Sequence, residues 1–297
     1  MANKKSKVHY FYPMTQVGEE TKLVDLLPIL SELQDIAPEE RLLDEGDGNI
    51  QLKKISFNKD FKKWELCFLR NKVDAPFRTR LDDDTDAAEA LDEDEFIGHE
   101  CCMLYDEVTG IIALQNNRNS ISFAGVSQLL GKYAQIGIFL SAIVYEEKYC
   151  EILEEDGIEY KSVIIAYTDI TKIRELATME EYKSVEFLAK LTTDMSALNG
   201  KIELSVGRGK SFLGKAALKQ FVNFFKKHKE ITSNLKVKMV DDDTIRLIDL
   251  LSNKASDEFE ISVTKDDPKT FKKILNALNA IFDTALTTTL EKCKKII

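Results

Sequence analysis

The chain has 297 residues, of which 44% are hydrophobic and 31% are charged. This composition excludes a disordered chain, because such chains contain too few apolar residues to offset the entropy lost on folding. The length allows one large or two ordinary domains, and we expect two. No run approaches the roughly 20 apolar residues of a membrane-spanning helix, and no apolar run follows the basic first residues. We therefore expect a cytoplasmic protein with no membrane partner.

The formal net charge of −10 conceals two halves of opposite sign. Residues 1–170 contain 33 acidic and 18 basic residues, a balance of −15, whereas residues 171–297 contain 18 acidic and 23 basic residues, a balance of +5. The change of sign coincides with a loss of strand patterning at 168–185, which indicates a domain boundary. The expected domains are an acidic α+β domain at 1–170 and a basic α+β domain at 171–297 that ends in a long helix.

The first expected domain consists mainly of strands. Alternating or continuous apolar runs predict strands at 8–14, 50–57, 64–71, 96–105, 110–116, 138–145 and 162–167. Helical spacing of leucines predicts a helix at 21–33, which Pro28 should kink, and a second helix is expected at 123–133. The segment 81–95 contains nine acidic residues and no basic one. Because unpaired buried carboxylates are costly, we expect an exposed loop there.

The second expected domain has a simpler order. The pattern predicts strands at 201–206, 235–240 and 259–263 and helices at 213–229 and 267–293. We interpret Asp266, Asp267 and Pro268 as the capped start of the last helix. Strands and helices in this mixed order indicate an α+β fold with mixed or antiparallel sheets rather than a doubly wound sheet.

A glycine-rich segment at 204–215 invites comparison with a phosphate-binding loop. Gly207 stands only two residues before Gly209, whereas the P-loop motif needs four residues between its glycines. We therefore interpret the segment as a turn in which Ser211 helps to cap the following helix.

The surrounding segment 201–238 is strongly basic, with ten basic and two acidic residues. On a helix, Lys215, Lys219 and Lys226 fall on one side, beside an apolar stripe. The candidate binding residues are this triad and four further side chains, Arg208 and Lys210 before the helix, and Gln115 and Arg118 in the polar cluster at 115–120. Three interpretations remain open, namely contact with nucleic acid through 201–238, contact with an acidic protein surface, or a solvated face.

No set of residues meets the requirements of a catalytic site. Glu146 and Lys148 form the E-x-K triplet of restriction-type nucleases, but a chain with 31% charged residues contains this triplet by chance. The five cysteines form no C-x-x-C pair, so we interpret them as reduced thiols packed mostly in the core. We expect no catalytic residue, no metal site and no cofactor.

Several soft motifs resemble proteins of similar length in Firmicutes, prophages and phages, a family with only a domain-of-unknown-function label. The motifs lie at 96–100 (Phe-Ile-Gly-His-Glu), 105–106, 112–120, 202–210 and 247–251. They carry no catalytic residue that could be transferred. The resemblance implies a role in the conflict between phage and host, without choosing between attacker and defender.

We expect a non-enzymatic protein-interaction protein in this conflict, such as a phage anti-defence inhibitor that binds a bacterial defence complex. The acidic half favours a basic partner, which it could meet by charge complementarity or by imitating nucleic acid. The alternative is a nucleic-acid-binding or nuclease component of a bacterial antiviral defence system. Halves of opposite charge also permit head-to-tail contacts between copies, so we expect the lysine triad to be used either between the subunits of a homo-oligomer or against a partner.

Overall fold

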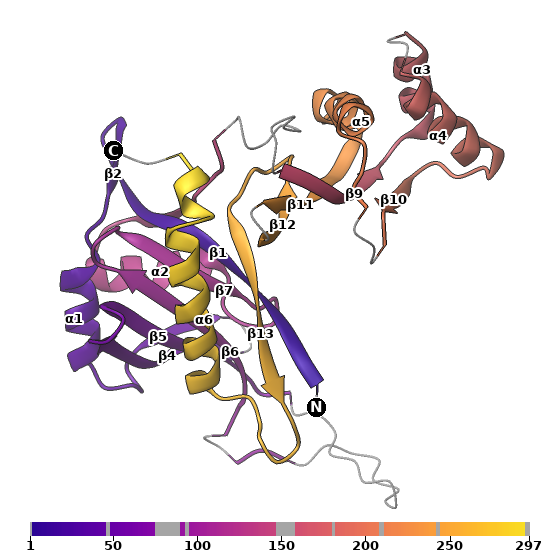
Figure 1. The fold of residues 1–297 in the computed structure, drawn as a ribbon. Coiled ribbons are helices and arrows are strands. Elements are labelled where there is room, and N and C mark those ends of the chain that lie inside the picture. Colours follow the sequence, from indigo (N-terminus) through magenta and orange to yellow (C-terminus); the bar gives the residue numbers. More distant parts are fainter. Residues whose placement is uncertain are drawn as a thin grey trace, which may run out of the picture. The chain divides into compact units, whose positions relative to one another are not determined.

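The computed structural model describes residues 2–45, 48–74, 90–92, 95–146, 158–179, 182–207, 211–241 and 244–294. The chain divides into two compact units. Figure 1 shows their helices and strands, coloured by position in the sequence. Unit 1 contains Met1–Ile143 and Ser256–Thr288, and unit 2 contains Val144–Ala255 and Thr289–Ile297. All described strand pairs in both units are antiparallel, which confirms the α+β class.

The two units do not coincide with the expected domains 1–170 and 171–297. Strand β13 (Ser256–Val263) returns to unit 1 and pairs with β1 (Ala2–Val17), from Ala2 opposite Val263 to His9 opposite Ser256. This pairing joins segments from opposite ends of the chain. Local composition therefore contains no signal for it.

The described residues of unit 1 form a nine-stranded sheet. Its main order is β13, β1, β7 (Ile111–Asn116), β6 (Ile97–Asp106), β5 (Lys63–Lys72), β4 (Gly48–Asn58) and β3 (Leu42–Glu45). Two further strands, β2 (Glu20–Leu23) and β8 (Ile138–Ala142), pair with the second half of β1. The predicted strands at 50–57, 64–71, 96–105 and 110–116 are confirmed as the antiparallel run from β4 to β7.

Helices α1 (Leu27–Asp35) and α2 (Phe123–Ala134) pack on one face of this sheet. The prediction of a helix at 21–33 is wrong in its first part, because residues 20–23 form β2. Pro28 stands in the first turn of α1, where its missing N–H removes no helical hydrogen bond, so the proline does not interrupt the helix. The predicted α2 is confirmed, and the Ser122 hydroxyl accepts a hydrogen bond of 3.1 Å from the Gly125 N–H as its cap.

Helix α6 (Phe271–Leu286) covers the opposite face of the sheet in unit 1 (Figure 1). The ring of Phe282 stacks on that of Tyr10 in β1, with centroids 5.9 Å apart. Because α6 covers only Phe271–Leu286, the expected helix at 267–293 is too long, and its expected cap is also wrong. Thr270 is the cap and accepts a hydrogen bond of 3.3 Å from the Lys273 N–H, while Pro268 lies before the helix. Beyond α6, a separate 3-10 turn covers Leu290–Lys292.

Unit 2 contains a four-stranded sheet in the order β10 (Gly200–Ser205), β9 (Ile158–Tyr167), β11 (Thr232–Asp241) and β12 (Thr244–Asp249). Helix α5 (Lys215–Lys227) contributes Phe224 and Phe225 to the buried apolar core of the unit. Two helices that the sequence did not predict, α3 (Ile170–Met179) and α4 (Lys183–Asp194), begin within the expected domain boundary at 168–185. The Tyr167 hydroxyl and the Thr192 hydroxyl, 2.9 Å apart, tie α4 to β9.

Most of the acidic segment 81–95 lies outside the described residues, so its expected exposure stays a prediction. Among the helices that are described, none is long and apolar enough to cross a bilayer.

Candidate functional site

The lysine triad lies on α5, but not on its most exposed side. Lys215, Lys219 and Lys226 are all half-buried beside the apolar stripe that packs into unit 2. The Lys215 ammonium stands 3.9 Å from a carboxylate oxygen of Glu159 in β9. The exposed stripe of the helix is mostly uncharged and consists of Ala216, Ala217, Gln220, Asn223 and Lys227. The outward face of α5 is thus less basic than the helical spacing predicts.

The other basic candidates of this segment separate into two groups. Arg208 and Lys210 lie outside the described residues. Three lysines share the face of the sheet that is turned away from the buried Val163 and Ile165: Lys201 pairs with Ala166, Lys236 with Ile164, and Lys238 with Ser162. Asp249 lies opposite Lys236, with 3.9 Å between ammonium and carboxylate. The expected cap of α5 is wrong, because Gly214 rather than Ser211 precedes the helix.

The side chain of Gln115 in β7 has a structural role in the sheet of unit 1. Its side chain is buried, its carbonyl oxygen accepts a hydrogen bond of 3.0 Å from the Cys102 N–H, and its amide donates one of 3.2 Å to the Ser6 hydroxyl. These bonds join three neighbouring strands of unit 1. Arg118 is exposed in the turn after β7. Gln115 and Arg118 thus belong to unit 1, whereas the lysine triad belongs to unit 2.

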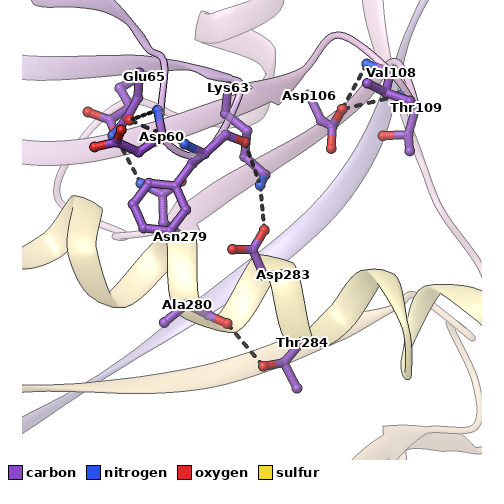
Figure 2. Close-up of polar contacts among 12 residues, drawn as sticks. Asp60, Lys63, Glu65, Asp106, Val108, Thr109, Asn279, Ala280, Asp283 and Thr284 are labelled. Carbon is purple, nitrogen blue, oxygen red and sulfur yellow. Dashed lines mark hydrogen bonds and ion pairs between the residues drawn. The ribbon is translucent and has the colours of Figure 1, made fainter.

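A polar cluster that the sequence analysis missed lies between the sheet of unit 1 and α6 (Figure 2). The carboxylate of Glu65 accepts hydrogen bonds from the amides of Asn58, at 2.7 Å, and of Asn279, at 2.8 Å. Lys63, two residues earlier on β5 and on the same face, forms an ion pair with Asp283 of α6. Figure 2 shows both links from β5 to α6. Asn279 is a polar residue inside the apolar stripe of α6, and it is the sequence signal that could have revealed this cluster.

The polar cluster is built for packing rather than for chemistry. The Lys63 side chain is only 4% exposed, and its ammonium lies 5.4 Å from the Phe282 ring centroid and 5.8 Å from that of Phe61. It also donates a hydrogen bond of 3.2 Å to the Phe61 carbonyl. Buried polar groups of this kind hold one specific packing when their partners are present. We therefore assign the cluster to the docking of α6 on the sheet.

The described thiols are likewise unsuited to chemistry. Cys67, Cys101, Cys102 and Cys293 are buried, which confirms the predicted core packing for these four, whereas Cys150 lies outside the described residues. Burial raises the pKa of the Cys101 and Cys102 thiols above the ordinary value of 9.0, so the reactive thiolate is disfavoured. Among the described residues, no group of three His, Cys, Asp or Glu side chains could hold a metal ion.

Large apolar side chains are exposed on helices α3 and α4 of unit 2 and in the segment that follows α4. Met179 is 80% exposed, and Phe187, Met195 and Leu198 are each 72% exposed. We call these four residues the apolar set. On α4, Val185, Leu188 and Ala189 point into the core, so Phe187 lies on a side of the helix that the described residues leave uncovered. Single exposed apolar residues are ordinary, whereas contiguous exposed apolar patches mark interaction surfaces, so four such residues within 179–198 make this segment the candidate interaction region of unit 2.

Comparison with known protein families gives a match over nearly the whole chain. Residues 1–294 match a family described as "Family of unknown function (DUF6731)". The chain belongs to the DUF6731 family. No curated protein matches the chain. The matched residues include parts of both units.

Part of the motif set that carries the resemblance has a structural role in this DUF6731 protein. Residues 97–100 and 105–106 belong to β6, and residues 112–116 belong to β7, both in the centre of the sheet of unit 1. Asn117 donates a hydrogen bond of 2.8 Å to the Glu100 carbonyl, and Ser120 donates one of 2.6 Å to the His99 carbonyl. These polar residues close the turn after β7 against β6.

Proposed function

We propose that this protein is a non-enzymatic interaction protein in the conflict between phages and bacteria. Specifically, it acts in the bacterial cytoplasm as a phage anti-defence inhibitor that binds a protein of a defence complex. The apolar set of unit 2 is the observation that carries the proposal. The polar cluster and the buried thiols support the non-enzymatic part of the proposal, because their described residues serve packing.

The apolar set supplies the driving force that binding needs. Full burial of a side chain of this size is worth about 1.5–3 kcal/mol, so four such residues are sufficient for the centre of an interface. Charges then select the partner and accelerate the encounter, and the balance of −15 over residues 1–170 favours a basic partner. The resemblance to phage and prophage proteins supports the biological setting.

The proposal is tested by capture from a lysate of the bacterial host at low salt and at about 150 mM salt. The immobilised protein is compared with the variants Phe187→Asp and Val108→Asp. Val108 is 84% exposed in the turn between β6 and β7 and provides a matched control in unit 1. We expect the parent and Val108→Asp to retain the same host protein in stoichiometric amount and Phe187→Asp to lose it. Retention of no host protein, or equal retention by all three, would contradict the proposal.

Nucleic-acid binding is the second candidate, and one observation favours it. Lys201, Lys236 and Lys238 lie on a common face of the sheet in unit 2, at 201–238, where the sequence analysis places the basic segment. Each phosphate that they neutralise releases counterions, so the affinity must fall steeply with salt. Fluorescence anisotropy at about 50 mM salt with single- and double-stranded DNA and RNA tests whether the protein binds nucleic acid. Absence of binding to all four ligands eliminates this candidate.

A further inference from the structure

The outer edge of β10 is the feature of unit 2 that remains without a described partner. β10 is the first strand of the sheet and pairs with β9 on one side only, from Gly200 opposite Tyr167 to Ser205 opposite Ser162. Among the described residues, no other strand pairs with it. Most of its side chains are exposed, and Leu204 is 47% exposed. A strand edge presents unpaired N–H and C=O groups that another strand can bind.

The residues of β10 are complementary to a second copy of themselves. The strand reads Gly-Lys-Ile-Glu-Leu-Ser, so a basic residue and an acidic residue flank Ile202 symmetrically. In an antiparallel pair, residues directly opposite each other share a face of the sheet. A two-fold axis through Ile202 would place each Lys201 opposite Glu203 of the second copy and Ile202 opposite Ile202. It would also place the exposed Leu204 opposite Gly200, whose missing side chain leaves room.

The other registers that preserve the two faces of the sheet are worse. An axis through Glu203 places two glutamates opposite each other, and one through Lys201 does the same with two lysines, which is destabilising. An axis through Leu204 pairs only residues 203–205 of the strand with each other. The register centred on Ile202 pairs residues 200–204 and satisfies both charges. Isologous contacts of this kind are the commonest basis of two-fold homodimers.

We propose that two copies of this chain associate through antiparallel pairing of their β10 strands in the register centred on Ile202. The pairing joins the two four-stranded sheets of unit 2 into one continuous sheet. It buries the exposed side chain of Leu204 and forms two intermolecular pairs between Lys201 and Glu203. Because pairing over one short strand is a small interface, the dissociation constant should lie in the range of about 1–100 µM. The inference is independent of the identity of any host partner.

Sedimentation of the full chain over this concentration range, with single and double charge reversals, tests the register. Lys201→Glu and Glu203→Lys each convert two attractive pairs into two repulsive ones, so each should weaken the dimer at least about ten-fold. The double variant exchanges the charges and should restore the affinity to within about three-fold of the parent. Lys238→Glu is the control, because it makes the same charge change on the same face but on the interior strand β11.

Folding of each variant is checked by circular dichroism. Lys201 and Glu203 lie opposite Ala166 and Ile164 within the chain, so the reversals should leave the melting temperature almost unchanged. A parent that stays monomeric throughout the range would overturn the inference. So would a dimer that tolerates both single reversals, or a double variant that remains as weak as the singles.

Discussion

Replacement of Asp283 by alanine should destabilise unit 1 by leaving a buried charge without its counter-ion. Lys63 is 4% exposed at its side chain, whereas Asp283 is 45% exposed. The two partners are therefore not equivalent. Loss of Asp283 strands an ammonium between aromatic rings, while loss of the Lys63 charge leaves a carboxylate that water can solvate.

The size of the effect follows from this difference in exposure. Removal of one partner from a fully buried pair costs about 3–5 kcal/mol, and water that reaches the half-exposed position 283 reduces this to about 2 kcal/mol. Lys63→Met keeps most of the packing and should cost less than about 1 kcal/mol. The double variant Lys63→Met/Asp283→Ala should therefore be more stable than Asp283→Ala alone, although it has lost more polar groups.

Urea unfolding followed by tryptophan fluorescence measures these changes in unit 1. The chain contains a single tryptophan, Trp64, which is buried in β5 next to Lys63. With a slope of about 2 kcal/mol per molar urea, Asp283→Ala should lower the midpoint by about 1 M. If Lys63→Met proved as destabilising as Asp283→Ala, or if the double variant were the least stable, the argument from the stranded charge would be refuted.

Two further predictions concern the cap of α6 and the buried thiols. Thr270→Ala should cost about 1 kcal/mol in the same urea assay, whereas Asp266→Ala, at the expected but wrong cap, should change the stability by less than about 0.5 kcal/mol. Stability should fall above pH 9, because the unfolded thiols of Cys101 and Cys102 ionise near 9.0 while burial raises their folded pKa and keeps them protonated. Between pH 8 and pH 10 the two thiols together should lower the free energy of unfolding by about 3 kcal/mol. The variant Cys101→Ala should halve this loss. An unchanged pH dependence of the stability in this variant would exclude the Cys101 thiol as its source.

The strands of unit 1 could be predicted from the sequence where their pairing is local. β4 with β5 and β6 with β7 are hairpins, so a period of two residues and a polar turn define each of them. The return of β13 to β1 could not be predicted, because no short-range pattern records which distant strand lies beside another. For the same reason the expected domain boundary at 168–185 differs from the limits of the compact units.

The helices were predicted less well, for reasons that differ between them. α3 and α4 are short, and polar residues interrupt their apolar spacing, so only the loss of strand patterning was visible. On α5 the spacing correctly places Lys215, Lys219 and Lys226 beside the apolar stripe, but it does not show how closely the sheet approaches them. Their half-buried position follows from tertiary packing. Their use against a partner or between copies stays a prediction.

The polar cluster and the apolar set also depend on tertiary structure. Glu65 and Asn279 stand more than two hundred residues apart in the chain and meet only because α6 covers the sheet of unit 1. Phe187 looks like an ordinary core residue in the sequence, and only the packing of α4 leaves it 72% exposed. Exposure therefore separates candidate binding residues from core residues of the same type.

Phage plating on bacteria that express this protein tests the proposed function most directly. A panel of strains, each with one defence system, is infected with a phage that the system restricts, in the presence of the parent protein, Phe187→Asp or Val108→Asp. The parent and Val108→Asp should raise the efficiency of plating on at least one strain, and Phe187→Asp should not. Unchanged plating on all strains, reduced plating, or full activity of Phe187→Asp would contradict an anti-defence inhibitor that acts through the apolar set.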